Sequence, residues 1–238
     1  MSNKQSNIEE IKFVARAFLY QDINETPYSP IVVIHPIFES GFASIIKNGE
    51  MQMVNIMDSE EDLEYARKEY LRRIKQQDSV HGIYSIIRKS YRLTFLKFIK
   101  TYLSKKDFSE LLADAWVSSE NPNQDINVPL KTAISWFRQA DKKVLMSEDE
   151  YKFYNSLPEI ITVYRGVAVG RNPKGLSWTC NKATAEWFAN RYNTETKRGY
   201  IQSVDVAKNC ILAYFNSRNE DELVVDTTMI EGRIKYDT

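Results

Sequence analysis

The spacing of apolar residues divides the chain into a helix-rich first half and a strand-rich last third. Ser59, with Asp62 three residues later, predicts the N-terminal cap of a highly charged helix that continues through EDLEYARKEYLRRIKQQ. We expect Gly82 to interrupt this pattern, because glycine weakens helix interiors. Apolar residues then recur at helical spacing between Ile83 and Leu103, so a second helical stretch should follow.

Three further helices are predicted in the middle of the chain. Asp107 and Glu110 form a D-x-x-E pattern that is typical of a helix start. Pro129 fits the first turn of the next helix, after the loop-forming segment SSENPNQDINV. Ser147 and Glu150 should cap the third helix, which the Leu-Pro pair after it should end.

The pattern of residue types changes after this Leu-Pro pair. Short β-branched or aromatic segments alternate with turn residues: ITVY, LSWT, GYIQSVDV, CILAYF, ELVVD and RIKY. One helix interrupts them, with Asn181 as its cap and an apolar face whose aromatic members, Phe188 and Tyr192, are spaced as core residues. Helices followed by a run of strands predict an α+β fold with a helical N-terminal region, not an alternating parallel α/β fold.

Composition and charge exclude several classes of function. The 238 residues include 32 basic and 32 acidic side chains, so net charge does not favour nucleic acid or an anionic membrane as the partner. No run of 18 apolar residues is present, so we expect no membrane span. The polar opening MSNKQSNIEE does not look like a secretory signal, and we expect a cytoplasmic protein.

The scarcity of histidine and cysteine narrows the possible chemistry. His35 and His81 lie far apart without an HExxH motif, and Cys180 and Cys210 form no CxxC pair, so no metal site is expected. His35, which follows an apolar run, is expected to be packed and hydrogen-bonded. Catalysis would therefore depend on carboxylates, arginines and hydroxyls.

Seven basic residues and no acidic ones lie between Arg88 and Lys106. Such a stretch could bind an acidic partner or nucleic acid. It could equally be a solvated helix face, balanced by the acidic segment Asp58–Glu64. The second interpretation is favoured.

Other polar residues recur at the ends of the predicted strands. Arg165 ends an apolar segment, and an arginine fork binds phosphate or carboxylate oxygens. Ser177 and Thr179 are two residues apart, so on a strand their hydroxyls face the same side. Glu220 and Glu222 share this parity and would present two carboxylates at the next strand. Together these groups suit an anionic ligand whose reacting carbon becomes positively charged.

Two further segments resemble known catalytic motifs only in part. The segment 170–175 has the glycine spacing of a phosphate loop but lacks its lysine. Gly175-Leu176-Ser177 begins like a hydrolase elbow, but both histidines lie upstream of this serine, which is the wrong order for that triad. Neither a nucleotide triphosphatase nor a serine hydrolase is therefore expected.

Three ordered motifs resemble a known family. VYRG, then GLSWT with the AEWFANR helix, then EDELVV are similar to the motifs of the arginine–serine–glutamate class of mono-ADP-ribosyltransferases, which includes bacterial toxins and phage enzymes. The resemblance implies a split antiparallel β-sandwich that binds NAD, preceded by a helical lobe. We expect residues 1–106 to form the helical region, which would cover the cleft or bind the target, and residues 107–238 the catalytic domain.

The resemblance also implies roles on the NAD side of the site. Arg165 would contact a phosphate and ribose of NAD, and the backbone of Gly166 would hold the nicotinamide amide. Ser177 would orient Glu222, with Thr179 completing the motif. Glu222 would bond the ribose 2′-hydroxyl and stabilise the oxocarbenium ion as nicotinamide leaves. Trp178, where many relatives have a small residue, should point into the core.

Further roles concern the acceptor and the rest of the cleft. Glu220 would position or deprotonate the acceptor side chain. Tyr214 and Phe215 would lie in the substrate-recognition turn. Phe188 and Arg191 would line the nicotinamide and phosphate side. Taken singly, however, the arginine could be a surface ion-pair residue and the acidic residues a solvated hairpin end.

The sequence therefore predicts an enzyme that transfers ADP-ribose from NAD, a consumed substrate, to a side chain of a target protein, with arginine favoured. A phage or bacterial effector fits this pattern. Two alternatives remain open: an NAD glycohydrolase with the same site, and a non-enzymatic inhibitor or adaptor that binds through the basic stretch Arg88–Lys106.

Overall fold

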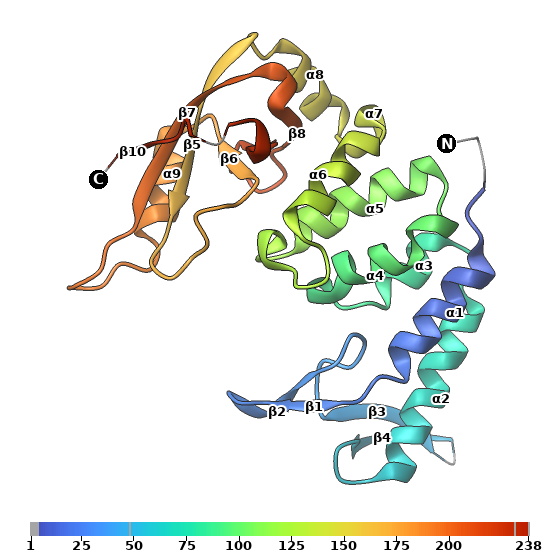
Figure 1. The fold of residues 1–238 in the computed structure, drawn as a ribbon. Coiled ribbons are helices and arrows are strands. Elements are labelled where there is room, and N and C mark those ends of the chain that lie inside the picture. The colour runs from blue at the N-terminus through green and yellow to red at the C-terminus, as the bar shows by residue number, and fades with distance from the viewer. Residues whose placement is uncertain (1–4, 48, 231, 238) are drawn as a thin grey trace. The chain divides into compact units, whose positions relative to one another are not determined.

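The computed structural model describes residues 5–47, 49–230 and 232–237. The chain forms two compact units, Met1–Leu111 and Leu112–Thr238 (Figure 1). The division falls inside helix α5 (Lys105–Ser118), a few residues beyond the expected boundary at 106/107. In the described residues no helix is both long enough and apolar enough to span a membrane.

The first unit contains helices over the two predicted helical stretches and one further helix near the N-terminus. They are α1 (Ile8–Leu19), α2 (Glu60–Gln76), α3 (Val80–Ser85) and α4 (Arg92–Ile99), with short 3-10 turns at Lys89–Tyr91 and Lys100–Tyr102 and the start of α5. Ser59 caps α2 by accepting the N–H of Asp62, as predicted. The interruption after α2 lies at Gln77 and not at Gly82, which is inside α3, because Ser79 caps that helix.

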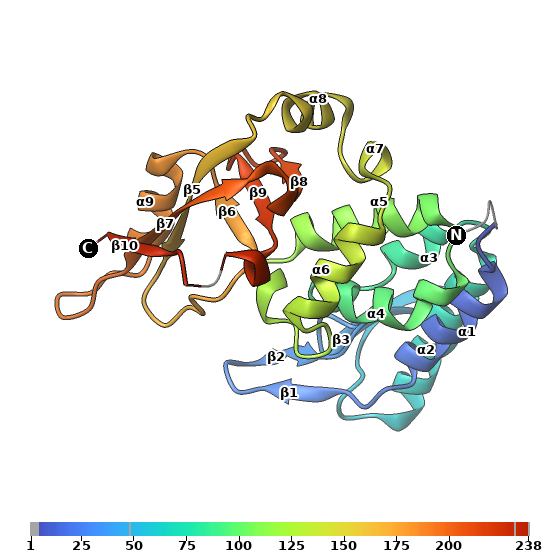
Figure 2. The ribbon, with the colours of Figure 1, turned by 45° about the horizontal axis from the view of Figure 1, so that its top comes forward.

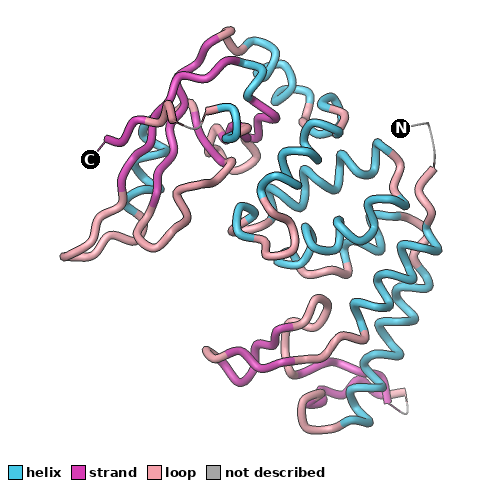
Figure 3. Tube along the Cα trace, viewed as in Figure 1, coloured by secondary structure: helices cyan, strands magenta, loops and turns pink. Residues whose placement is uncertain are grey.

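Two β-hairpins in the same unit correct the expectation of a wholly helical N-terminal region. Strands β1 (Asn24–Thr26) and β2 (Ser29–Ile34) form one hairpin, and β3 (Phe42–Lys47) and β4 (Glu50–Asn55) form the other (Figure 3). Strands β1 and β4 each contain one β-branched residue and no aromatic one, so neither hairpin offers two segments with the composition of a strand. Gly49 turns the second hairpin with φ +83°, a conformation that glycine adopts readily.

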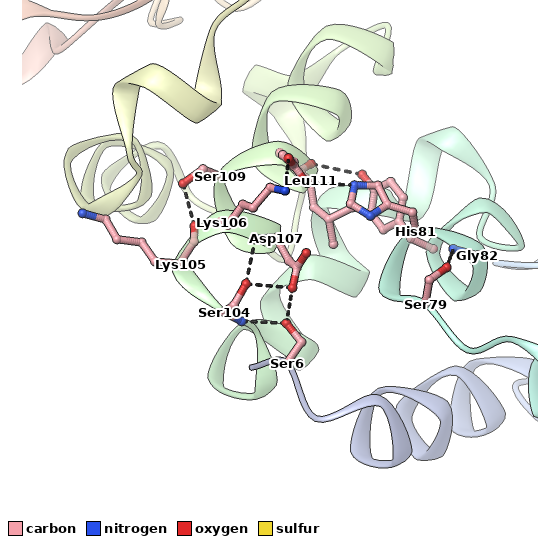
Figure 4. Close-up of polar contacts among 12 residues, drawn as sticks. Ser6, Ser79, His81, Gly82, Ser104, Lys105, Lys106, Asp107, Ser109 and Leu111 are labelled. Atoms are coloured by element: carbon pink, nitrogen blue, oxygen red, sulfur yellow. Dashed lines mark hydrogen bonds and ion pairs between the residues drawn. The ribbon is translucent and has the colours of Figure 1, made fainter. Parts of the chain in front are cut away.

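Helix α5 begins one turn earlier than the D-x-x-E pattern indicates (Figure 4). The hydroxyl of Ser104 accepts the N–H of Asp107 at 3.0 Å, so the cap is Ser104. The Asp107 carboxylate accepts hydrogen bonds from the hydroxyls of Ser104, at 2.7 Å, and Ser6. A serine one residue before two lysines gave too weak a signal to displace the stronger acidic pattern.

The second unit combines helices with one antiparallel sheet. After α5 come α6 (Leu130–Gln139), α7 (Lys142–Leu145), α8 (Glu148–Ser156) and α9 (Lys182–Asn190). The strands are β5 (Ile160–Val167), β6 (Ser177–Thr179), β7 (Tyr200–Ala207), β8 (Ile211–Phe215), β9 (Glu222–Val225) and β10 (Lys235–Asp237). Their order is β10-β7-β5-β6-β9-β8 (Figure 2). All six predicted strands, the Ser147–Glu150 capping box and the Asn181 cap are confirmed.

The shortest strand pairing of the sheet is the one between β5 and β6. These strands share one register pair, Tyr164 with Thr179, whereas β5 pairs with β7 along its full length. Helix α9 packs on β5, and a Cβ on Gly166 would lie 2.1 Å from the carbonyl oxygen of Ala185. Glycine at this position therefore allows the helix to approach the strand, and the two together form one wall of the site described next.

Candidate active site

A pocket of about 410 Å³ opens in the second unit, beside the single β5–β6 pairing. It collects residues from the segment after α5, from β5, β6 and α9, and from the loop before β9. Its lining includes nearly all of the predicted site: Arg165, Gly166, Ser177, Thr179, Phe188, Arg191, Glu220 and Glu222. Residues that are 57 positions apart in the sequence thus meet in one cavity.

Arg165 lies on β5 with its guanidinium held by carbonyl groups. Its Nη1 donates to the Ser177 carbonyl at 2.5 Å, and its Nη2 donates to the Asn172 carbonyl at 3.1 Å. Among the described residues its buried Nε finds no acceptor, and no carboxylate lies within ion-pair distance. Burial lowers its pKa to about 10, with Glu222 opposing the shift, so it stays cationic at neutral pH. Gly175 leaves room for the guanidinium, because a Cβ there would lie 2.3 Å from Nη2.

Glu222, at the start of β9, is a buried carboxylate with 7% of its surface exposed. Its Oε1 accepts the indole N–H of Trp116 at 3.0 Å, and the Ser177 hydroxyl also donates to it. Burial raises its pKa, and these two hydrogen bonds offset only part of that rise. The resemblance implies that Ser177 orients this glutamate, and the lowering effect of Ser177 on the pKa of Glu222 is consistent with that role.

The segment between α5 and α6 fixes the serine. Nδ2 of Asn123 donates to the Ser177 hydroxyl at 2.9 Å, and Oδ1 of Asn123 accepts the N–H of Leu176 at 2.6 Å. Because the asparagine occupies an acceptor site of the hydroxyl, the hydroxyl hydrogen is free to point to Glu222. One amide side chain therefore sets both the position of β6 and the direction of the serine hydrogen bond.

The loop before β9 brings the second carboxylate to the pocket. Glu220 Oε2 lies 2.8 Å from Nη2 of Arg218, and Glu222 Oε2 lies 3.7 Å from the same nitrogen. Asn219 and Asp221 adopt left-handed φ values of 56° and 48°, so the chain turns sharply on either side of Glu220. The two glutamates converge as predicted, with an arginine between them.

The opposite side of the pocket is basic and aromatic. Arg171 donates to Asn121 Oδ1 at 3.1 Å and lies over the ring of Tyr192. Arg191 lies over the rings of Trp187 and Tyr192. Neither arginine has a carboxylate partner among the described residues. Arg165, Arg171 and Arg191 thus leave positive charge available to an anionic ligand.

Several predictions are corrected by burial. Tyr214 and Phe215 are each 4% exposed, so neither offers a surface to an acceptor. Tyr214 donates to Asp221 Oδ1 at 2.8 Å and stacks on Phe153. Burial, followed by its contact with Asp221, raises the pKa of the Tyr214 hydroxyl. All five positions of β8 are buried, because α6 and α8 both pack against this strand.

The other predicted side chains have either a structural role or a place in the pocket lining. Trp178 is buried, as predicted, and Thr179 supports the local backbone by donating to the Glu220 carbonyl and accepting the N–H of Asn181. Tyr192, expected in the core, is 42% exposed and lines the pocket. Phe188 is half-buried and also lines it. Helix α9 ends before position 192, so helical spacing no longer decides where that ring points.

Trp116, Asn123 and Arg218 are site residues that the sequence did not reveal. The tryptophan and asparagine come from outside the three motifs and act only through tertiary contacts. Arg218 stands next to the acidic motif and could have been noticed, because a cation two and four residues from two glutamates is a potential ion-pair partner.

Three of the seven basic residues between Arg88 and Lys106 have packing roles within the first unit. Nη1 of Arg88 donates to the carbonyls of Val33, His35 and Phe38 at 2.8–3.1 Å. Arg92 lies over the ring of Tyr84, and Lys100 over that of Phe108, where burial lowers the pKa of the lysine. These contacts weaken the interpretation of the stretch as a binding surface.

The two histidines have local partners. His35 is buried, and its Nδ1 accepts the N–H groups of Ile37 and Phe38. Burial lowers its pKa to about 4, so it is neutral, as a packed histidine should be. His81 Nε2 lies 3.2 Å from Glu110, and both lie near Asp107, with ligand-type atoms within 4.8 Å of one another. Lys106 and two serine hydroxyls also contact these carboxylates, which is consistent with a polar network (Figure 4).

Protein-family models, curated proteins and solved structures contain no match to this chain. The pocket itself and the three ordered motifs are thus the basis for a functional proposal.

Proposed function

We propose that this chain is a mono-ADP-ribosyltransferase that transfers ADP-ribose from NAD to a side chain of a target protein, with arginine the favoured acceptor. One observation carries the proposal: Glu222, a buried carboxylate fixed by Trp116 and Ser177, faces the same pocket as three arginines that lack carboxylate partners. An anionic dinucleotide whose ribose becomes cationic needs both features.

The basic side of the pocket fits the pyrophosphate of NAD. Arg171 and Arg191 are exposed enough to reach phosphate oxygens, and Arg165 keeps an unused buried N–H. Charge-assisted hydrogen bonds of this kind are about twice as strong as neutral ones. The rings of Trp187 and Phe188 offer apolar surface to a flat heterocycle such as nicotinamide.

The carboxylate side fits the bond-breaking step. The bond between C1′ of the ribose and the ring nitrogen of nicotinamide breaks, its electron pair leaves with nicotinamide, and C1′ becomes cationic. Ionised Glu222 would stabilise that charge, and its position in a low-dielectric pocket would strengthen the effect. No histidine is needed for this step, which agrees with the remote positions of His35 and His81.

Glu220 is suited to receive the acceptor. Its carboxylate is 27% exposed and already binds one guanidinium, that of Arg218. An arginine of another protein could make the same contact and lose a proton to Glu220 as it attacks C1′. The narrow β5–β6 junction supports the split antiparallel β-sandwich that this enzyme family has. NAD is an intracellular metabolite, so we place the reaction in the cytoplasm, where a phage or bacterial effector would act.

Labelled NAD with cell lysate tests the proposal. Wild type should release nicotinamide and label protein, whereas Glu222→Gln should lower both by at least ~10²-fold. Glu186→Gln, which changes an exposed glutamate on α9, is the matched control and should behave as wild type. Nicotinamide release without labelled protein would instead indicate an NAD glycohydrolase. Absence of both NAD binding and release by wild type would refute the proposal.

A further inference from the structure

Arg218 occupies the place where the proposed acceptor would bind. Its guanidinium nitrogen Nη2 lies 2.8 Å from Glu220 Oε2 and 3.7 Å from Glu222 Oε2, and the residue lines the pocket. Among the described residues it is the only cation within ion-pair distance of either carboxylate. A guanidinium of the chain itself therefore already rests beside both proposed catalytic carboxylates.

The loop that carries Arg218 has a defined shape. Asn216 accepts the N–H of Asp221 through its side chain at 3.0 Å and the N–H of Asn219 through its carbonyl at 2.9 Å. Its own N–H donates to Glu150 Oε1 at 2.8 Å. These hydrogen bonds therefore fix the backbone on both sides of Arg218, and the hydrogen-bonded loop places the arginine at the pocket.

We propose that Arg218 is a self-modification site, at which the chain attaches ADP-ribose to its own guanidinium. The inference rests on the proposed transferase function and deepens it. An acceptor must reach Glu220 and lie near the ribose that Glu222 binds, and Arg218 meets both conditions from the same chain. Its side chain is 42% exposed, so it has room to change rotamer.

The reaction is balanced without another reactant. The C1′–nitrogen bond of NAD breaks, and nicotinamide leaves with the electron pair. A nitrogen of the Arg218 guanidinium forms the new bond to C1′ and gives its proton to Glu220. The products are ADP-ribosyl-arginine, nicotinamide and one proton, which Glu220 passes to solvent.

Arg218 could instead serve only to neutralise the two glutamates. A static ion pair would hold the loop but would never acquire a new covalent bond. The two roles therefore differ in a directly measurable product. Modification within one chain also has a kinetic signature, because its rate per molecule does not depend on protein concentration.

Purified full-length protein incubated with NAD, followed by peptide mass spectrometry, tests the inference. We expect one ADP-ribose on the peptide containing Arg218, at a rate unchanged by tenfold dilution of the protein. Arg218→Gln should lose this modification, and thermal unfolding would verify that the variant is folded. Free ADP-ribose in place of NAD controls for chemical glycation, which would label exposed lysines such as Lys89.

The outcomes separate this inference from the function on which it rests. Nicotinamide release by wild type with no modification at Arg218 overturns self-modification and leaves the transferase intact. A label that appears only at high protein concentration overturns transfer within one chain. No nicotinamide release at all overturns both proposals.

Discussion

Strand β9 begins and ends at buried carboxylates that have opposite surroundings. At its start, Glu222 accepts hydrogen bonds from Trp116 and Ser177, and its pKa is raised by burial. Directly after its end, Asp226 is 2% exposed but pairs with Arg138 through Nε and Nη2 at 3.1 and 2.5 Å.

The second carboxylate shows what a buried acid needs when it serves stability. Burial alone would raise the pKa of Asp226, but hydrogen bonds from Thr228 and Arg138 outweigh burial and lower it. Glu222 lacks such compensation, since Arg218, at 3.7 Å, is the only cation within ion-pair distance of it in the described part of the chain. The fold thus gives one carboxylate a close cationic partner and leaves the other without one, as the proposed cationic reaction centre requires.

The largest expected effect is on Glu222. Glu222→Gln should lower nicotinamide release by about 10²- to 10³-fold, because an amide cannot stabilise the cationic ribose. The same change should leave the free energy of unfolding unchanged or slightly higher, because it removes an uncompensated buried acid. Steady-state kinetics and urea unfolding together check this. A Glu222→Gln variant that keeps wild-type activity but loses stability would contradict the contrast between Glu222 and Asp226.

Asp226 should show the reverse pattern. Asp226→Asn should lower the free energy of unfolding by about 1–3 kcal/mol, since it removes a charged acceptor from buried hydrogen bonds. Nicotinamide release per folded molecule should stay near the wild-type value. Chemical denaturation measures the first quantity, and activity normalised to the folded fraction measures the second. Loss of activity without loss of stability would place Asp226 in the site instead.

Trp116 should have an intermediate effect on catalysis. Trp116→Phe removes the N–H that donates to Glu222 while keeping most of the apolar volume. We expect about a tenfold loss of nicotinamide release, comparable to one hydrogen bond to a charged group. The acidic limb of the pH–rate profile should also move to higher pH, because a stabilising bond to the ionised form is lost. Trp136→Phe changes another buried tryptophan, which lies on α6 and does not line the pocket, and so shows the effect of ring change alone.

The smallest effect is the pH dependence of stability, which should differ in sign between the two carboxylates. For Glu222 the folded pKa is raised, so its contribution to stability falls as the pH rises from the ordinary glutamate value through the folded pKa. For Asp226 the folded pKa is lowered, so its contribution falls as the pH drops from the ordinary aspartate value through the folded pKa. Unfolding curves measured across acidic pH check this. The pH dependence of the free energy of unfolding should lose the Glu222 contribution in Glu222→Gln and the Asp226 contribution in Asp226→Asn.

The secondary structure of the second unit was predictable because the sequence signals for its strands and helix caps are local. Short β-branched segments, turn residues and caps such as Ser147 and Asn181 depend on neighbours within a few positions, and all six strands were identified. The hairpins of the first unit were missed because β1 (NET) and β4 (EMQMVN) each contain one β-branched residue and no aromatic one, so neither hairpin has two recognisable strand segments. Tyr214 and Phe215 were misplaced because the resemblance assigned them to the substrate-recognition turn, whereas both lie on β8, in which every position is buried.

By itself the sequence determined which residue types are available for chemistry, and in what order: an arginine, a serine and two glutamates on successive strand ends, with no suitably placed histidine. Only the tertiary structure decided their surroundings. Trp116 and Asn123 reach the site through hydrogen bonds across 106 and 54 positions, and α6 brings Arg138 to Asp226 across 88. The physical reason is that burial and hydrogen bonding set the pKa of a carboxylate, and both depend on packing between segments that are distant in sequence.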